Sequence, residues 1–277
     1  MGEPESEQKQ EPDNSNHQTN LPDQQSIVGQ VRKEVVQGFV PEPRASKRAK
    51  ILVTVYLVVF GLFLLLAWFV HIHPILPIDV AITQEFQEQQ LPWLKWFMIA
   101  VSFLGNQTLV FAGLVLLTAA LFWLIRLRLE AVFVVGLSIV SAALNQLIKY
   151  IVGRPRPTSN LVEIFQHANG QSFPSGHVMS YLAYWGLLFS LGLILFKRDR
   201  WWHYLFLIIS ALFVLLVGPS RIYLGDHWAS DVLGGYMFGG LLLGMALWLY
   251  LSLKERGFLV PKDKISSRRL VDLPAQE

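Results

Sequence analysis

Three short polar segments lie at the edges of long apolar runs, and they hold the residue types that phosphate chemistry requires. They are residues 149–157, 174–177 and 220–231. A charged residue at such an edge must reach water or meet a charged ligand, because a charge inside the hydrocarbon layer is costly. Lysine, arginine, histidine and a carboxylate together can bind a phosphate group and stabilise its charge during transfer. These segments therefore predict a phosphate-handling site.

The segment 149–157 places cations just after an apolar run. Lys149 ends the run and Arg156 follows, with Pro155 and Pro157 stopping the helix in this stretch. We expect one cation at a helix end and one on a stiff loop, both directed at an anion. Their chemistry does not separate Arg154 from Arg156. The alternative role is snorkelling, in which long cationic side chains reach lipid headgroups.

The segment 174–177 has the features of a helix start. Ser175 is a good N-cap residue, and the next apolar run begins directly after it. The N-terminus of a helix offers free N–H groups to an anion. Gly176 permits close approach of the backbone to a ligand, and His177 can give a proton near neutral pH. A capping motif with an interfacial histidine is the alternative interpretation.

The segment 220–231 holds a histidine and a carboxylate at helical spacing. His227 and Asp231 are four residues apart, so on the helix that opens the last span they are expected to share a face. A carboxylate in this position fixes the tautomer of the imidazole, and Arg221 can bind phosphate oxygens in bidentate fashion. Asp226 is predicted to be a loop residue that points elsewhere. A structural His–Asp pair at a membrane surface is the alternative.

The elements that carry these segments are predicted to be membrane-spanning helices. Of the 277 residues, 53% are hydrophobic and 16% are charged, whereas soluble domains average about 25% charged. A helix needs about 20 apolar residues to cross a bilayer. Six runs approach or reach this length, namely residues 51–70, 109–125, 131–148, 177–196, 204–217 and 232–253. We therefore predict an all-α integral-membrane six-helix bundle, with residues 92–105 as an interfacial lead-in to the second span.

The distribution of cations orients these spans. Lysine and arginine are concentrated before the first span, between the second and third, between the fourth and fifth, and after the sixth. By the positive-inside rule, these connections and both termini are expected in the cytoplasm. The third-to-fourth and fifth-to-sixth connections are separated by two crossings. All three polar segments are therefore expected on one side of the membrane, which is then the outer side.

Residues 1–50 and 254–277 are predicted to be cytoplasmic tails that flank a six-span domain of residues 51–253. Glutamine, glutamate, asparagine and proline dominate the start of the chain, and such a composition cannot bury enough apolar surface to fold. The chain has no cysteine, which excludes disulfides and thiolate metal sites. The net charge is +3, and many of the lysine and arginine residues flank the spans, where they serve as orientation signals. No nucleic-acid partner is therefore expected.

The three polar segments resemble the signature of the type 2 phosphatidic acid phosphatase family, which vanadium-dependent haloperoxidases share. The matching runs are KYIVGRPRP from Lys149, PSGH from Pro174 and SRIYLGDHWASD from Ser220. All signature positions are present and in order, and the resemblance extends over residues 51–253. Three motifs that fit one six-span topology make the match specific.

The resemblance implies a role for each signature residue. His227 is expected to be the nucleophile that forms a phosphohistidine, with Asp231 as its carboxylate partner, and His177 is expected to protonate the leaving group. The phosphate-binding residues implied by the resemblance are Lys149, Arg156, Ser175, Gly176 and Arg221. Enzymes of this kind need no metal or other cofactor. In agreement, no pair of carboxylates faces a histidine at metal-ligand spacing in the sequence.

We therefore predict a membrane lipid phosphatase, with phosphatidate, phosphatidylglycerol phosphate or a polyprenyl diphosphate as its substrate. The short loops are similar to those of bacterial members, so a bacterial cell membrane is expected. The alternatives are a vanadate-dependent haloperoxidase and a non-catalytic protein that binds or transports a lipid phosphate. The oligomeric state is not predicted.

Overall fold

The computed structural model of the protein describes residues 43–166, 168–196, 201–256 and 258–259. The chain divides into two compact units, Met1–Val53 and Thr54–Glu277. Of the first unit, only residues 43–53 are described, and they form the opening turns of a helix. Residues 1–42 of the first predicted tail and most of the predicted tail of residues 254–277 thus lie outside the described residues. Residues 43–50, predicted as part of the first tail, are instead helical.

Every regular element within the described ranges is helical. The elements are α2 (Pro43–Ile72), α3 (Pro77–Gln87), α4 (Pro92–Asn106), α5 (Thr108–Leu124), α6 (Arg128–Val152), α7 (Gly176–Tyr181), the π-helix η1 (Leu182–Gly186), α8 (Leu187–Leu195), α9 (Trp201–Tyr223) and α10 (Ala229–Glu255). Five continuous helical runs in this part of the chain are long and apolar enough to cross a membrane, and α4 with α5 passes the same test as a bent pair. The predicted all-α membrane bundle is confirmed, and counting the bent pair as one span gives six.

The bent pair departs from a simple span in a way that matters for the site. Residues 92–105, predicted as an interfacial lead-in, form α4 together with Asn106. Gln107 then leaves the helical conformation, with φ −100° and ψ 88°, and α5 starts at Thr108 at an angle of 69° to α4. This bend brings the polar residues 106–108 beside the other helices instead of burying them within a straight span.

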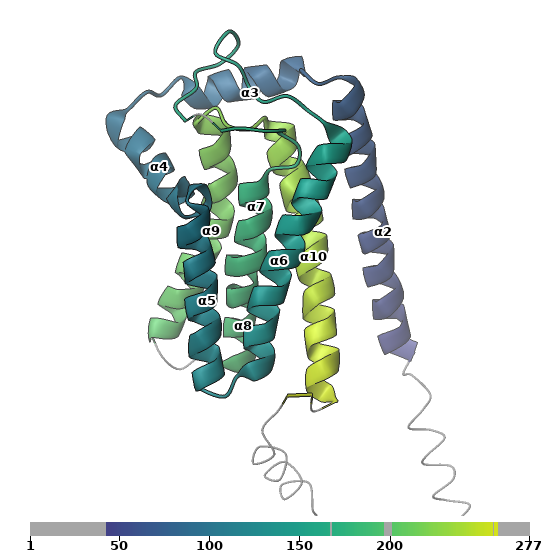
Figure 1. The fold of residues 1–277 in the computed structure, drawn as a ribbon. Coiled ribbons are helices and arrows are strands. Elements are labelled where there is room, and N and C mark those ends of the chain that lie inside the picture. The colour runs from purple at the N-terminus through teal and green to yellow at the C-terminus, as the bar shows by residue number, and fades with distance from the viewer. Residues whose placement is uncertain (1–42, 167, 197–200, 257, 260–277) are drawn as a thin grey trace, which may run out of the picture. The chain divides into compact units, whose positions relative to one another are not determined.

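Helix α3 lies across one end of the bundle (Figure 1) and was not predicted from the sequence. Pro77 opens it at a position where the missing N–H costs nothing. Its polar residues Asp79, Thr83 and Gln87 are buried. Buried polar groups require hydrogen-bond partners. The partners of the Asp79 carboxylate are Arg154, in the loop after α6, and Ser230, on α10.

The core forms where α6, α7, η1, α8 and α10 run side by side (Figure 1). A Cβ atom on Gly235 would lie 3.0 Å from Val178, and one on Gly239 would lie 2.9 Å from Leu182, so α10 packs closely against α7 and η1. In lipid, such close packing stabilises helix contacts. Gly240, on the same helix, has no neighbour within 4 Å and takes no part in this contact.

Candidate active site

His227 lies in the short connection between α9 and α10, in a turn that Gly225 allows by adopting φ +73°. The sequence had predicted His227 on the last helix, which is wrong because α10 begins at Ala229. Its ring is nevertheless beside Asp231, since Nδ1 lies 3.5 Å from Oδ2 of the carboxylate. Nδ1 also lies 3.3 Å from the Ser172 hydroxyl.

The two ring nitrogens of His227 have different neighbours, and these assign its tautomer. Nε2 lies 3.3 Å from Nη1 of Arg156, and a guanidinium group can only donate hydrogen bonds. Nε2 is therefore the acceptor, and the ring hydrogen belongs on Nδ1, which faces the Ser172 hydroxyl and the Asp231 carboxylate. Burial, and then the nearby cations of Arg156, Lys149 and Arg221, hold the pKa of His227 well below its usual range. The arrangement gives a neutral imidazole with a free lone pair on Nε2.

Asp231 is fixed from three sides. Its carboxylate accepts hydrogen bonds from Arg154 Nη1 at 2.7 Å, from the Trp228 N–H at 2.9 Å and from the Ser172 hydroxyl. Arg154 and Asp231 are both fully buried. The carboxylate therefore cannot rotate away from His227 without breaking the hydrogen bond to Nη1 of a buried arginine, which is costly.

Arg154 joins Asp231 to α3. Its Nη2 atom lies 2.7 Å from Oδ2 of Asp79, and Asp79 also accepts hydrogen bonds from the backbone N–H of Ser230 at 2.9 Å and from its hydroxyl. We call Asp79, Arg154 and Asp231 the ionic chain. Two carboxylates neutralise one guanidinium here, and hydrogen bonds occupy the remaining oxygens, as a stable buried network requires.

The structure separates the two arginines that their chemistry could not distinguish. Arg154 is only 1% exposed, and its guanidinium is paired with Asp79 and Asp231 in the ionic chain. Arg156 lines a cavity, and its Nη1 atom donates to the Asp226 carbonyl at 2.7 Å. Lys149, near the end of α6, lines the same cavity and donates to the Gln171 carbonyl. Arg156 and Lys149 are therefore the cations that face the space where an anion can bind.

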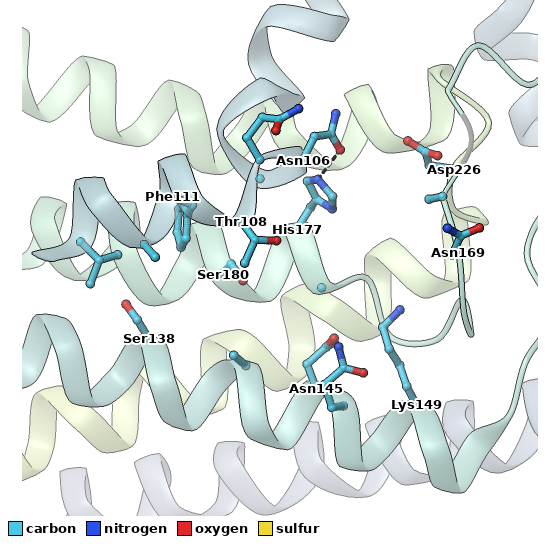
Figure 2. Close-up of a pocket in the computed structure, with 18 of the residues that line it drawn as sticks. Asn106, Thr108, Phe111, Ser138, Asn145, Lys149, Asn169, His177, Ser180 and Asp226 are labelled. Carbon is cyan, nitrogen blue, oxygen red and sulfur yellow. Dashed lines mark hydrogen bonds between the residues drawn. The ribbon is translucent and has the colours of Figure 1, made fainter.

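The helix start predicted at Ser175 is confirmed, but its capping role is wrong. α7 begins at Gly176, yet the Ser175 hydroxyl makes no cap hydrogen bond. This buried hydroxyl has no hydrogen-bond partner among the described residues. Gly176 and His177 line the cavity. His177 Nε2 lies 2.7 Å from Oδ1 of Asn106, a contact drawn in Figure 2.

Arg221 is fully buried in the last turn of α9 and forms an ion pair with Asp226. Asp226 lies in a loop, as predicted, and its carboxylate pairs with this signature arginine, a partner that the sequence analysis did not identify. Arg221 Nη1 also donates to Oδ1 of Asn106 at 3.2 Å, while its Nε–H has no partner among the described residues. An unpaired buried donor of this kind is rare in folded proteins.

The cavity has a volume of about 900 Å³ and joins two environments. At one end are Lys149, Arg156, His177 and His227. Toward the other end it runs between α5 and α6 (Figure 2). The apolar lining residues there are Phe111, Ala112, Val115, Leu116, Val135, Ile139 and Ala142. A molecule with a charged head and an apolar tail would fit the polar and apolar ends of this cavity.

The structure thus gathers most of the predicted site and adds residues that the sequence analysis missed. Lys149, Arg156, Gly176, His177 and His227 line one cavity, while Asp231, Ser175 and Arg221 are not among its lining residues. The additional residues are Asp79, Asn106, Asn145, Ser172 and Ser230. A carboxylate or amide inside a largely apolar stretch was the available signal for Asp79, Asn106 and Asn145. No group of three or more His, Cys, Asp or Glu side chains within the described ranges could hold a metal ion.

Comparison with known proteins gives concordant matches. Residues 127–255 match the family model of the PAP2 superfamily. The chain is 31% identical over 188 residues to phosphatidylglycerophosphatase B of Bacillus subtilis (strain 168), which covers 66% of this chain and 88% of that protein. It is 30% identical over 134 residues to undecaprenyl-diphosphatase BcrC of the same organism, covering 48% of this chain and 64% of the relative.

A solved structure has a similar fold. It is the crystal structure of a transmembrane PAP2-type phosphatidylglycerolphosphate phosphatase from Bacillus subtilis, with a TM-score of 0.61 and 26% sequence identity. The similarity covers 72% of this chain and 96% of that one. Nearly the whole of the solved chain therefore has a counterpart here.

Proposed function

Because the chain belongs to the PAP2 superfamily and is a multi-pass membrane lipid phosphatase, we propose that it works through a covalent phosphohistidine on His227. The observation that carries this proposal is the environment of His227 Nε2. Its lone pair is free of a ring hydrogen, and the nitrogen lies beside Arg156 in a cavity that also holds Lys149 and His177. A nucleophile, a phosphate clamp and a proton donor are thus within one space.

In the first step, His227 Nε2 attacks phosphorus while the bond from phosphorus to the leaving oxygen breaks. His177 gives the hydrogen on its Nε2 atom to that oxygen. The imidazole becomes positively charged as the P–N bond forms, and the Asp231 carboxylate beside Nδ1 stabilises that charge. In the second step, water attacks phosphorus and gives a proton to His177, so that inorganic phosphate leaves and both histidines return to their starting state.

The phosphate oxygens are bound by cations and by groups that lack partners. Lys149 and Arg156 present their charges to the cavity. The Ser175 hydroxyl and the Arg221 Nε–H are buried and unpaired among the described residues, and phosphate oxygens would satisfy both. Such preorganised donors stabilise the charge that spreads over the oxygens during transfer.

In this proposal, the apolar part of the cavity holds the tail of the lipid substrate between α5 and α6. Phosphatidate, phosphatidylglycerol phosphate and polyprenyl diphosphates all carry a phosphate on a long apolar tail, and all three stay candidates. Phosphatidylglycerol phosphate is favoured by the name of one relative, phosphatidylglycerophosphatase B, of which this chain covers 88%. The relatives named as phosphatases favour hydrolysis over a haloperoxidase or a non-catalytic carrier.

The test is phosphate release from these three lipids in detergent with EDTA present, comparing the wild-type protein with His227→Ala. We expect release by the wild type in the presence of the chelator and none by the variant, which should elute normally in size-exclusion chromatography. Loss of wild-type activity in EDTA, or an active His227→Ala variant, would contradict the mechanism.

We further propose that both termini are cytoplasmic and that the site faces the outer side of the membrane. The absence of native cysteine makes this testable. In intact cells, a membrane-impermeant maleimide should label Asn160→Cys, which lies in the exposed loop between α6 and α7. It should not label Gln276→Cys until the cells are permeabilised. The opposite pattern would reverse the orientation.

A further inference from the structure

The bend between α4 and α5 forms a socket for the His177 ring. Asn106, the last residue of α4, places its Oδ1 atom 2.7 Å from His177 Nε2. The preceding residue has no side chain, and a Cβ atom on Gly105 would lie 2.2 Å from Cδ2 and 2.9 Å from Nε2 of the ring. The imidazole therefore lies directly against the Gly105 backbone. We call Gly105 and Asn106 the His177 socket.

Hydrogen bonds around Asn106 determine which way its amide points. Arg221 Nη1 lies 3.2 Å from Oδ1, and Nδ2 donates to Gln166 Oε1 at 2.9 Å. A guanidinium group has no acceptor, so the atom facing Arg221 must be the amide oxygen. The same oxygen faces His177, and it can only accept. His177 Nε2 must therefore carry a hydrogen, and that hydrogen is held at the wall of the cavity that His227 also lines.

We propose that Asn106 is a positioning residue that, within the His177 socket, keeps His177 in the form with a hydrogen on Nε2 until a substrate arrives. This inference rests on the proposed role of His177 as proton donor. The ester oxygen of a bound lipid replaces Oδ1 as the acceptor. As the P–O bond breaks and the P–N bond to His227 forms, the Nε2 proton moves to the leaving oxygen.

This role has a consequence that depends on the leaving group. A lipid alkoxide is a strong base and leaves slowly unless it is protonated, whereas nitrophenolate is a weak base and leaves without help. A positioned general acid contributes roughly 10²–10⁴-fold to reactions that need it. Damage to the His177 socket should therefore slow alkyl phosphates far more than p-nitrophenyl phosphate. Damage to packing alone should slow both equally.

The experiment measures kcat for dioctanoyl phosphatidate and for p-nitrophenyl phosphate in the same detergent. We expect Asn106→Ala to lower kcat by about 100-fold on the lipid and far less on the nitrophenyl ester. Asn106→Asp keeps an acceptor for Nε2–H but adds a negative charge that retains the proton, so its lipid activity should lie between those of Asn106→Ala and the wild type. In a His177→Ala background, Asn106→Ala should add no further loss, because residues that act together are not additive.

Glycine variants supply a second, matched test. Gly105→Ala should displace the His177 ring and reproduce the selective loss, whereas Gly113→Ala on α5 meets nothing within 4 Å and should leave both activities unchanged. An equal loss on both substrates, or full lipid activity in Asn106→Ala, would overturn the inference while leaving the proposed function intact. A wild-type protein that releases phosphate from none of the three candidate lipids would overturn the proposed function itself and, with it, this inference.

Discussion

The two histidines of the site are held by different kinds of support. On one side, His227 rests on the ionic chain, in which two carboxylates and a guanidinium are buried together. On the other side, His177 rests on the uncharged His177 socket. The difference fits the chemistry proposed for each ring. The nucleophile becomes positively charged in the reaction, and a carboxylate stabilises that charge. The acid must release its proton, and an anion beside it would retain that proton.

The supports also differ in where they lie in the chain. Arg154, Ser172 and Asp231 fall within the 127–255 region that matches the family model, whereas Asp79, Gly105 and Asn106 precede it. The early helices α3 and α4 thus complete a site whose signature residues all come later. Variants that change one support at a time can show how far the two are independent.

The largest effect is expected at the carboxylate of the ionic chain. Asp231→Asn should lower kcat by roughly 10³–10⁴-fold, as loss of the orienting aspartate does in catalytic triads. The amide can no longer stabilise the charged phosphoimidazole, and it can stabilise the wrong ring tautomer. Phosphate release and trapping of the phosphoenzyme would measure this. A loss no greater than that of Asn106→Ala would remove the distinction between the two supports.

The second prediction separates the neighbouring arginines. Arg154→Met leaves two buried carboxylates without their cation, and breaking a buried pair costs about 3–5 kcal/mol. The unfolding temperature in detergent should fall markedly. Arg156→Met removes a cavity-facing cation, so it should keep the unfolding temperature within a few degrees and lower kcat/KM instead. Equal unfolding temperatures would show that the ionic chain adds little to stability.

A smaller effect is expected in the pH dependence of kcat/KM, which reports the free enzyme. The pKa of His227 lies well below its usual range because of burial and nearby cations. The nucleophile thus stays neutral in mildly acidic solution, and activity is lost only as pH falls through this lowered pKa. Arg156→Gln removes one of those cations, so the acid limb should move to higher pH. The wild type and the variant are assayed on the same substrate, so titration of the substrate affects both profiles equally. An acid limb at the same pH in both proteins would contradict this account.

The smallest effect is expected far from both histidines. Glu130 at the start of α6 accepts hydrogen bonds from Tyr250 at 2.7 Å and from Lys254 at 3.1 Å, both on α10. Lys254 is 31% exposed and Glu130 is 5% exposed. A glutamine at position 130 keeps an uncharged acceptor, so the change does not leave a buried donor unpaired. Glu130→Gln should therefore lower the unfolding temperature slightly and leave phosphate release unchanged. A loss of activity would mean that the site is coupled to this distant end.

Sequence reasoning could predict the spans and the signature residues because both depend on neighbours along the chain. Apolar runs of sufficient length identify the helices, and the polar residues at their ends identify the site. It could not assign Arg154 and Arg156 to different roles, because the partners of Arg154 lie 75 and 77 residues away. Likewise, the contact of Asn106 with His177 joins residues 71 positions apart. It depends on the 69° bend after Asn106, and the predicted boundary at residue 105 marked the place of this bend but not its angle.

Local rules failed at Ser175, and at Asp226 they gave the loop position but not the partner. Ser175 has the residue type and position of an N-cap, yet its hydroxyl does not cap α7. Asp226 lies next to His227 in a loop, yet it is buried and paired with Arg221. In both cases the polar group belongs to the site, where the need to bind or balance charge outweighs local helix preferences.

The ionic chain has a consequence for biosynthesis. A polypeptide is made from its N-terminus, and its early parts fold first. Asp79 is therefore made before Arg154, and it is available as a counter-ion as soon as that arginine is inserted. Asp231 arrives only with α10, the last helix, and His227 arrives just before it. A ribosome-bound intermediate that ends before α10 thus carries an arginine already neutralised but no nucleophile, so lipid cleavage begins only when synthesis of the helical domain is complete.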